Sequence, residues 1–293
     1  MNQCNKIQNQ TTIFEVMKWG QQVLEEHGRP DANIDAKLLM KHLLGFDETK
    51  LLLERHQKLA EHLKESYTYV IAKRAQGIPL QYITKNQEFM GLTFYVDHRV
   101  LIPRQDTETL IEHLIEKNKK EQFKKGVDIG TGSGCISISL VNYIDELCMT
   151  AIDLSEGALE VAEKNAKAHQ VADRIKFLQS DVLEAYNKDE KVDLVVSNPP
   201  YISEVDCRTL MQEVIGHEPR MALTDEGDGL SFYKRITHDA KAILKPRGTI
   251  AYEIGYDQGQ AVKTILEDAG FIEVEVHQDL AGKDRVVIAR NPV

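Results

Sequence analysis

The sequence predicts an α/β fold in which a small helical domain precedes a parallel, doubly wound sheet. Two patterns carry this prediction. Beyond residue 125, short apolar segments alternate with amphipathic helical segments, and repeated strand–helix units assemble into parallel sheets. Before residue 77, apolar side chains recur at helical spacing, which is typical of a helical bundle. The length of 293 residues accommodates both parts, because a typical domain has roughly 100–200 residues.

The composition is that of a globular protein, with 42% hydrophobic and 28% charged residues, so a sizeable core is expected. The net charge of −10 repels phosphate backbones, and we expect no direct nucleic-acid binding. The polar N-terminus and the lack of a long apolar run predict neither a signal peptide nor a membrane span. We expect a cytoplasmic monomer.

Cysteine and histidine spacing gives no indication of a metal centre or a redox pair. No two of Cys4, Cys135, Cys148 and Cys207 lie at C-x-x-C spacing. The ten histidines show no H-E-x-x-H pattern of the kind that binds zinc. We therefore interpret the cysteines as reduced thiols and predict no bound metal.

Residues 1–76 are predicted to form the helical domain. Thr12 and Glu15 have the spacing of a capping box, and Gly28 lies where the first helix would stop. A second helix is expected over residues 34–44, before Gly45, and a third over residues 63–76. The apolar stripes of these helices are most simply core, although the same faces could bind a partner.

Residues 77–104 are predicted to be a linker that contains a β-hairpin. Aromatic and β-branched residues gather at Phe89 and over residues 94–96, which is typical of short strands joined by a turn. A helix is expected to follow over residues 107–117.

Residues 105–293 carry the alternating elements of the α/β domain. Strands are predicted over residues 126–129, 148–154, 175–179, 192–197 and, after a Lys-Pro-Arg-Gly turn, 248–254. Helices are predicted over residues 136–143, 157–169, 230–244 and 258–269. The segments 271–276 and 285–289 are expected to pair as an antiparallel hairpin at the edge of the sheet.

Polar residues suited to a ribose-containing cofactor follow the first three strands. Asp128 and the glycine-rich run Gly130–Gly134 end the first strand, and glycines let the backbone turn sharply beside a ligand. Asp153 ends the second strand, where a carboxylate binds ribose hydroxyls. Asp181 follows the third strand, where a carboxylate could accept from an adenine amino group. S-adenosylmethionine and NAD both fit this pattern, and a ligand-free domain with a tight turn is a further alternative.

The segment Asn198-Pro199-Pro200-Tyr201 directly follows the buried strand 192–197. Proline cannot donate to the strand ladder, so the strand ends there and the neighbouring groups are held still. The side-chain oxygen of Asn198 and the carbonyl of Pro199 can then both accept from one planar –NH2 group, against which the Tyr201 ring can pack. Such positioning would supply most of the catalysis. A nicotinamide enzyme has no evident use for this element, so the segment favours S-adenosylmethionine.

Other polar residues receive simpler interpretations. Asp106 and Glu108 could form an acid–base pair, but negative charges are favourable at a helix N-terminus in any case. Residues 218–229 lie in a long connection that could shape substrate binding, and a solvated loop is the alternative. No proton-abstracting side chain is assigned, so a weak pH dependence near neutrality is expected.

Together these segments resemble the HemK-type protein-(glutamine-N5) methyltransferases over nearly the whole chain. The resemblance is carried by residues 77–83, 101–108, 128–134, 198–201, 218–220 and 279–285. Asn-Pro-Pro-Tyr alone is shared with adenine-N6 DNA methyltransferases, whereas Ile-Pro-Arg at 102–104 and Glu-Pro-Arg at 218–220 are more specific. Gln105 stands where members often have proline, and Val182 where some have an aromatic beside the adenine.

The resemblance implies a Rossmann-like, S-adenosylmethionine-dependent methyltransferase domain over residues 105–293 and a helical domain that recognises the substrate. The implied substrate is the glutamine of the Gly-Gly-Gln motif in class 1 peptide chain release factors, whose methylation modulates translation termination. A sister group acts on a ribosomal protein, and a module that merely senses the cofactor is another alternative. The expected cofactor-binding residues are Asp128, Gly130, Thr131, Gly132, Ser133, Gly134, Asp153, Leu154, Asp181, Val182 and Asn198. The expected substrate-binding residues are Asn198, Pro199, Pro200 and Tyr201, of which Asn198, Pro199 and Tyr201 are expected to be catalytic.

Overall fold

The computed structural model describes residues 11–292, and the chain divides into two compact units. The first unit reaches to Lys85 and also includes Gln212–His217, and the second consists of Asn86–Met211 and the chain from Glu218 onward. The first unit therefore extends beyond the expected boundary at residue 76. The reason is a short helix, α6 (Leu80–Thr84), which packs against α3 (Ala32–Leu44) and α5 (Glu61–Ala75).

The helices of the first unit begin and end largely where the sequence predicts. α2 (Ile13–Glu26) starts with the predicted capping box, in which Thr12 Oγ1 accepts from the Glu15 N–H at 3.2 Å and Glu15 Oε2 accepts from the Thr12 N–H at 3.0 Å. α3 ends at Gly45, whose φ of 65° is left-handed. Two further helices, α4 (Glu48–Glu54) and α6, are too short, at 7 and 5 residues, to display an amphipathic period in the sequence.

The core of this unit is packed around Tyr67. Its ring is fully buried, and its hydroxyl donates to the carbonyl of Ala36 at 2.8 Å, which ties α5 to α3. The approach of α2 to α5 depends on Gly20. A Cβ at this position would lie 2.6 Å from Tyr67 Oη and 2.9 Å from Ile71 Cδ1.

The predicted hairpin is confirmed in the segment between the helices and the sheet. β1 (Asn86–Phe89) pairs antiparallel with β2 (Leu92–Tyr95), with Phe89 opposite Leu92. Both residues of the turn between them have positive φ, 51° at Met90 and 69° at Gly91, which matches the twist of a tight hairpin.

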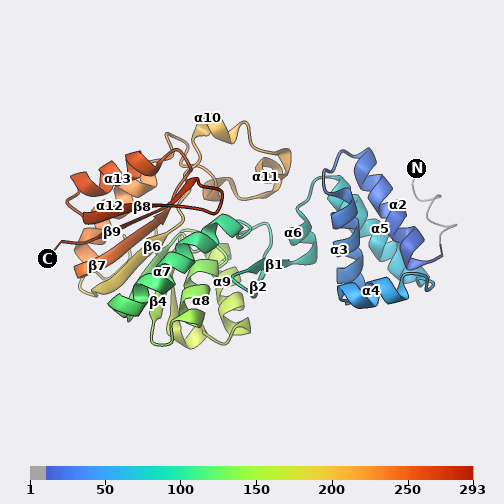
Figure 1. Cartoon of the computed structure of the whole chain (residues 1–293), viewed down its shortest axis with the longest axis horizontal. Coiled ribbons are helices and arrows are strands. Elements are labelled where there is room, and N and C mark those ends of the chain that lie inside the picture. The colour runs from blue at the N-terminus through green and yellow to red at the C-terminus, as the bar shows by residue number, and fades with distance from the viewer. Residues whose placement is uncertain (1–10, 293) are drawn as a thin grey trace. The chain divides into compact units, whose positions relative to one another are not determined.

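The second unit is built on a seven-stranded sheet in the order β5-β4-β3-β6-β7-β9-β8 (Figure 1). Its strands are β3 (Lys125–Ile129), β4 (Cys148–Asp153), β5 (Ile175–Gln179), β6 (Val192–Ser197), β7 (Leu244–Glu253), β8 (Ile272–Gln278) and β9 (Asp284–Arg290). Neighbours from β5 to β7 are parallel, and β9 runs antiparallel to both β7 and β8. The predicted parallel sheet with an antiparallel terminal hairpin is therefore confirmed.

Helices cover both faces of the sheet (Figure 1). One buried cluster joins α7 (Glu108–Glu121), α8 (Cys135–Tyr143) and α9 (Glu156–Ala168) to the sheet, and a second joins α12 (Ser231–Ile243) and α13 (Gly259–Asp268). The central strand β6 contributes side chains to both clusters, because Val196 belongs to the first and Val195 to the second. Shorter helical turns are η1 (Gln105–Thr107), η2 (Ala172–Arg174), α10 (Glu204–Cys207), α11 (Gln212–His217) and η3 (Arg220–Ala222).

The Lys-Pro-Arg-Gly segment at 245–248 differs from its prediction as a turn before a strand. β7 already begins at Leu244, which pairs with Val192, and the register shifts before Leu194 pairs with Thr249. The extra residues form a bulge within one long strand, with Arg247 at a φ of 64°. A bulge accommodates unpaired residues without ending the strand. The sequence therefore predicted the local irregularity correctly but wrongly placed it before the strand and not within it.

Five parallel strands place their carboxyl ends along one edge, which is where ligands bind in sheets of this kind. The residues that follow these ends include Gly130 after β3, Ser180 after β5 and Asn198 after β6. None of the helices in residues 11–292 is long and apolar enough to cross a membrane.

Gly20→Ala should destabilise the first unit, because its added methyl group would overlap the Tyr67 ring. Overpacking of this kind costs about 1–3 kcal/mol. The single tryptophan of the chain, Trp19, is buried in this unit, so its fluorescence during urea denaturation reports on the unit directly. The matched control is Gly216→Ala in α11 of the same unit, where a Cβ would meet no atom within 4 Å. Equal denaturation midpoints for the two variants would contradict the proposed close packing.

Candidate active site

A cavity of about 550 Å³ opens at the carboxyl edge of the sheet. Residues from seven segments of the sequence line it, the first at Arg99–Leu101 and the last at Phe232–Ile236. Nine of the residues predicted to form the site are among those lining it: Gly130, Gly132, Asp153, Leu154, Asp181, Val182, Asn198, Pro199 and Pro200. Five others lie behind the wall: Asp128, Thr131, Ser133, Gly134 and Tyr201.

The glycine-rich loop after β3 presents bare backbone to this cavity. Gly130 and Gly132 have φ values of 74° and 55°, and a Cβ at either position would meet no atom within 4 Å. Gly134 has a different purpose, because a Cβ there would lie 2.8 Å from Ile138 Cδ1. The first two glycines leave room for a ligand, and the third lets α8 pack closely.

Asp128 supports the loop from beneath and does not line the cavity. Its Oδ2 accepts from Thr131 Oγ1 and from Ser137 Oγ, both at 2.7 Å. Complete burial raises the pKa of Asp128 to about 6, although these hydrogen bonds oppose the rise. The sequence placed Asp128 among the cofactor-binding residues. In the structure its hydrogen bonds stabilise the conformation of the glycine-rich loop.

Asp153 at the end of β4 lies between the loop and the cavity. Its Oδ2 accepts from the Gly132 N–H and its Oδ1 from the Ser155 N–H, both at 2.9 Å. Burial raises the pKa of Asp153, and the backbone donors work against that rise. Each carboxylate oxygen has a second lone pair, so the group can still accept hydrogen bonds from a ligand in the cavity.

The far end of the cavity is formed by residues after β4 and β5. Asp181 Oδ2 pairs with Arg235 Nη2 at 2.9 Å, so this carboxylate is already shared with a cation. Val182 is buried with a φ of 52°, an unusual conformation for a β-branched residue. Leu154 contributes a half-exposed aliphatic side chain.

Asn198 lies in the cavity wall with its amide nitrogen directed toward Thr107. Its Nδ2 donates to Thr107 Oγ1 at 3.3 Å, and Thr107 is itself buried at the start of α7. Within the described residues, no protein hydrogen bond is made to the side-chain oxygen of Asn198, which is left available as an acceptor. Pro199 and Pro200 continue the wall beside it.

Tyr201 faces the core and not the cavity. Its ring packs against the cluster that contains α12 and α13. Its hydroxyl donates to Glu253 Oε1 at 3.4 Å, and its carbonyl accepts from Gln258 Nε2 at 3.0 Å. The sequence predicted that this ring would pack against the substrate, but here the ring backs the segment that carries Asn198.

The sequence analysis did not identify Glu253, the last residue of β7, as a candidate site residue. It is almost completely buried. Burial raises its pKa to about 7, although Thr107 and Arg285 oppose the rise. The available signal was that Glu253 is the single charged residue within the predicted strand 248–254. A carboxyl whose pKa is raised by burial therefore lies behind the site, at a position to which the sequence analysis assigned no role.

Three distant segments meet around this site through ion pairs. Arg104 Nη2 donates to Glu218 Oε1 at 2.5 Å, and Glu218 Oε2 accepts from the Ile102 N–H at 3.3 Å. Arg285 Nη2 pairs with Asp106 at 3.1 Å and with Asp279 at 3.2 Å. These contacts link residues 102–106, 218 and 279–285, which the sequence singled out only as separate motifs.

Asp106 in η1 and Glu108 at the start of α7 both have structural partners. Asp106 pairs with Arg285, and Glu108 Oε1 accepts from the Met90 N–H at 2.6 Å. Neither lines the cavity, which agrees with their interpretation as helix N-terminal charges. Gln105 is exposed in the first position of η1, a position at which proline is also tolerated.

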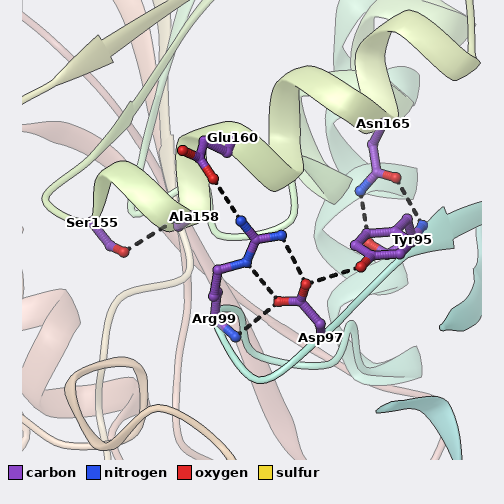
Figure 2. Close-up of polar contacts among 7 residues, drawn as sticks. All are labelled: Tyr95, Asp97, Arg99, Ser155, Ala158, Glu160 and Asn165. Carbon is purple, nitrogen blue, oxygen red and sulfur yellow. Dashed lines mark hydrogen bonds and ion pairs between the residues drawn. The ribbon is translucent and has the colours of Figure 1, made fainter. Parts of the chain in front are cut away.

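A polar cluster connects the hairpin and the segment that follows it to α9 (Figure 2). Asn165 on α9 is buried; its Oδ1 accepts from the Tyr95 N–H at 2.8 Å, while its Nδ2 donates to the Tyr95 carbonyl at 3.0 Å and to the Ser133 carbonyl at 2.9 Å. Arg99 is held by Asp97 through Nε at 2.9 Å and Nη2 at 2.8 Å. Its Nη1 reaches Glu160 at 2.6 Å. Since Arg99 also lines the cavity, this cluster holds one cavity wall against α9.

The residues that the structure describes contain no group of His, Cys, Asp and Glu side chains arranged to hold a metal ion. Cys135, Cys148 and Cys207 are free thiols, and Cys4 lies outside the described residues.

Comparison with known proteins places this geometry in a family. Residues 15–84 match the family described as PrmC N-terminal domain, and residues 104–245 match the Methyltransferase small domain. The release factor glutamine methyltransferase of Clostridium acetobutylicum is 41% identical over 256 residues, which cover 87% of this chain and 90% of that protein. The Bacillus subtilis protein of the same name is 40% identical over 284 residues, covering 95% and 97%.

Solved structures show the same fold at lower identity. The catalytic domain of hMettl16, in complex with a MAT2A 3'UTR hairpin, has a TM-score of 0.56 and 22% identity, covering 75% of this chain and 81% of that one. A methyltransferase from Pyrococcus furiosus has a TM-score of 0.51 and 16% identity, covering 77% and 100%. The fold is therefore that of a methyltransferase. With relatives of about 40% identity along most of its length, the chain belongs to the release factor glutamine methyltransferase family.

Proposed function

We propose that the protein transfers a methyl group from S-adenosylmethionine to the side-chain amide nitrogen, N5, of the glutamine in the Gly-Gly-Gln motif of class 1 release factors, and thereby modulates translation termination. The family to which the chain belongs supports the reaction and the class of substrate. The observation that carries the proposal is the orientation of Asn198, whose side-chain oxygen remains available because Thr107 accepts from its nitrogen.

The cavity fits S-adenosylmethionine. Gly130 and Gly132 leave open space where a side chain would otherwise stand, and Asp153 can still accept from ribose hydroxyls. Asp181 and Val182 line the part of the cavity suited to the adenine, with Leu154 beside them. When bound, this cofactor supplies an electrophilic methyl group. The product that remains after transfer is S-adenosylhomocysteine.

Supporting residues keep the proposed cofactor site in shape. Thr131 and Asp128 hold the loop through a buried hydrogen bond. Ser133 contributes its carbonyl to Asn165, and Gly134 allows α8 to pack. We assign these residues to the cofactor site through the backbone they position, and Gly130, Gly132 and Asp153 through direct contact.

The proposed chemistry relies on hydrogen-bond acceptors that are already in place. A glutamine –NH2 group has two hydrogens, which the Asn198 oxygen and the Pro199 carbonyl would accept. Holding both hydrogens fixes the direction of a nitrogen lone pair that is otherwise delocalised into the amide. Pro200 and Tyr201 hold this segment still, Pro200 from the cavity wall and Tyr201 from the core. Preorganised polar groups of this kind are usually the largest contribution to catalysis.

The protein substrate is favoured over nucleic acid. The net charge of −10 repels phosphate backbones, whereas a release factor can present its loop to the cavity. We assign the helical first unit to recognition of this protein partner. A ribosomal protein is the alternative substrate, and a purely cofactor-sensing module would have no use for an aligned acceptor such as Asn198. We expect the protein to act as a monomer in the cytoplasm.

Asp153→Ala should weaken S-adenosylmethionine binding, because it removes charge-assisted hydrogen bonds to the ribose. Bonds to charged groups contribute about 1.5–3 kcal/mol, which corresponds to about 10- to 100-fold in affinity. Isothermal titration calorimetry on the full-length protein measures the change. Asp173→Ala is the matched control, since this exposed aspartate precedes β5 and so lies at the edge of the sheet opposite to Asp153. Unchanged affinity in a folded Asp153→Ala protein would contradict the ribose assignment.

Asn198→Ala should lower turnover by about 100-fold or more, the usual cost of losing one preorganised group, while cofactor affinity changes little. Asn198→Asp should retain more activity, because an aspartate keeps the shape of the side chain and an acceptor oxygen. Single-turnover transfer of labelled methyl groups to a purified release factor measures both variants. Near-normal turnover in the alanine variant would rule out the acceptor role.

The substrate assignment is tested by the same labelling reaction with different acceptors. The wild-type protein should label an intact release factor but not a variant in which the Gly-Gly-Gln glutamine is alanine. Purified ribosomal proteins and DNA serve as competing substrates. Label appearing on a ribosomal protein or on DNA, and not on the release factor, would replace the proposed substrate.

A further inference from the structure

We propose that Glu253 is a positioning residue for methyl transfer, which fixes the Asn198 amide through Thr107 and backs the same segment through the hydroxyl of Tyr201. The inference rests on the proposed function, because it concerns the orientation of the group that would hold the substrate amide. Glu253 does not line the cavity, so it would act only through these neighbours.

The sheet register brings Glu253 to the level of Asn198. Parallel strands β6 and β7 pair with Ser197 opposite Tyr252. Asn198 and Glu253 are the residues that follow this pair, so they leave adjacent strands at the same edge. The position of Glu253 is therefore set by the backbone ladder that also sets the position of Asn198.

Two hydroxyl groups connect Glu253 to the cavity wall. Tyr201 donates to Glu253 Oε1 at 3.4 Å, and Thr107 stabilises the charged form of the same carboxyl. Thr107 already accepts from Asn198 Nδ2 at 3.3 Å. A threonine hydroxyl has one hydrogen to donate, and the Glu253 carboxylate is a suitable acceptor for it. This direction of donation keeps the nitrogen of Asn198 toward Thr107 and its oxygen toward the cavity.

The burial of the Glu253 carboxyl costs free energy that a residue with only a packing role would not need to incur. Its Oε2 is buried and has no hydrogen-bond partner among the described residues, and burying such a group costs free energy.

Five charged or titratable groups face Glu253. They are Arg285 and Asp106, Tyr201 and Cys135, and Tyr233, whose hydroxyl donates to the Glu253 carbonyl at 2.9 Å. Of these, Arg285 is the cation, and it is shared with Asp106 and Asp279. Weakly compensated carboxyls of this kind concentrate at functional sites.

A change in the protonation of Glu253 would alter the hold on Asn198. Burial raises the pKa of Glu253 to about 7, so the carboxylate form predominates above this pH and the neutral acid below it. A carboxylate accepts hydrogen bonds more strongly than a neutral acid does. Turnover should therefore rise with pH through about 7 in the wild-type protein, by about fivefold between pH 6 and pH 8.

The test is the pH profile of kcat for release-factor methylation by the full-length protein, with the affinity for S-adenosylhomocysteine measured in parallel by calorimetry. Glu253→Gln should lower kcat at pH 8 by about fivefold and flatten the profile, while KM for the cofactor and the calorimetric affinity stay within about twofold. The matched control is Glu267→Gln, which makes the same change on the exposed surface of α13 and should keep the wild-type profile. A Glu253→Gln protein that retains the wild-type kcat and pH dependence would overturn the proposal.

Substitutions at Thr107 test the same connection if Glu253→Gln does not fold. Thr107→Ser keeps the hydroxyl, and Thr107→Val keeps the shape without it. Thr107→Val should lose kcat as Glu253→Gln does, and Thr107→Ser should restore most of it. Equal rates for the two variants would overturn the proposal. Failure of the wild-type protein to label the release factor at any pH would instead count against the proposed function.

Discussion

The parallel pairing of β3, β6 and β7 is the constraint on which the site depends. Because the strands run in the same direction, the glycine-rich loop, Asn198 and Glu253 all emerge at one edge. A one-residue slip between β6 and β7 would turn the side chains of β6 to the opposite face of the sheet. The alternation of Val195 and Val196 between two buried clusters resists such a slip, so core packing determines where the polar groups of the site lie.

Long-range ion pairs then gather the segments that the sheet alone does not place. Arg104 and Glu218 are more than a hundred positions apart in the chain, and Arg285 reaches both Asp106 and Asp279. Glu218 is buried while Arg104 is partly exposed, so removing the arginine would leave a buried charge without its partner. A pair of this kind contributes little net stability, and its value lies in fixing how the wall of the cavity is assembled.

The sequence predicted the sheet elements well because each has a local cause. The strand 192–197 is apolar and ends at two prolines, and the glycine run follows Asp128. α4 and α6 are too short to show an amphipathic period. The local signal for α4 is its N-cap, Asp47, which accepts from the Lys50 N–H at 2.7 Å, and α6 has no side-chain cap. Tyr201 and Glu253 show a different limit. The tyrosine ring packs against a cluster built from α12 and α13, and its hydroxyl contacts a carboxyl 52 residues away, so no local pattern contains that information.

Two carboxyls, those of Asp128 and Glu253, are buried behind the site. Burial costs free energy in both cases, but the two groups hold different parts of the structure. Burial raises the pKa of both Asp128 and Glu253. Asp128 receives the hydroxyls of Thr131 and Ser137 on one oxygen, and these hold a loop whose backbone must not move. Glu253 instead accepts from the hydroxyl of Tyr201, and Thr107, which stabilises its charged form, accepts from Asn198 in the cavity wall. Hydrogen bonds to a charged group are stronger and more directional than those between neutral groups. A buried carboxylate can therefore orient a neutral amide such as Asn198 without placing a charge beside the substrate, where it would compete for the amide hydrogens.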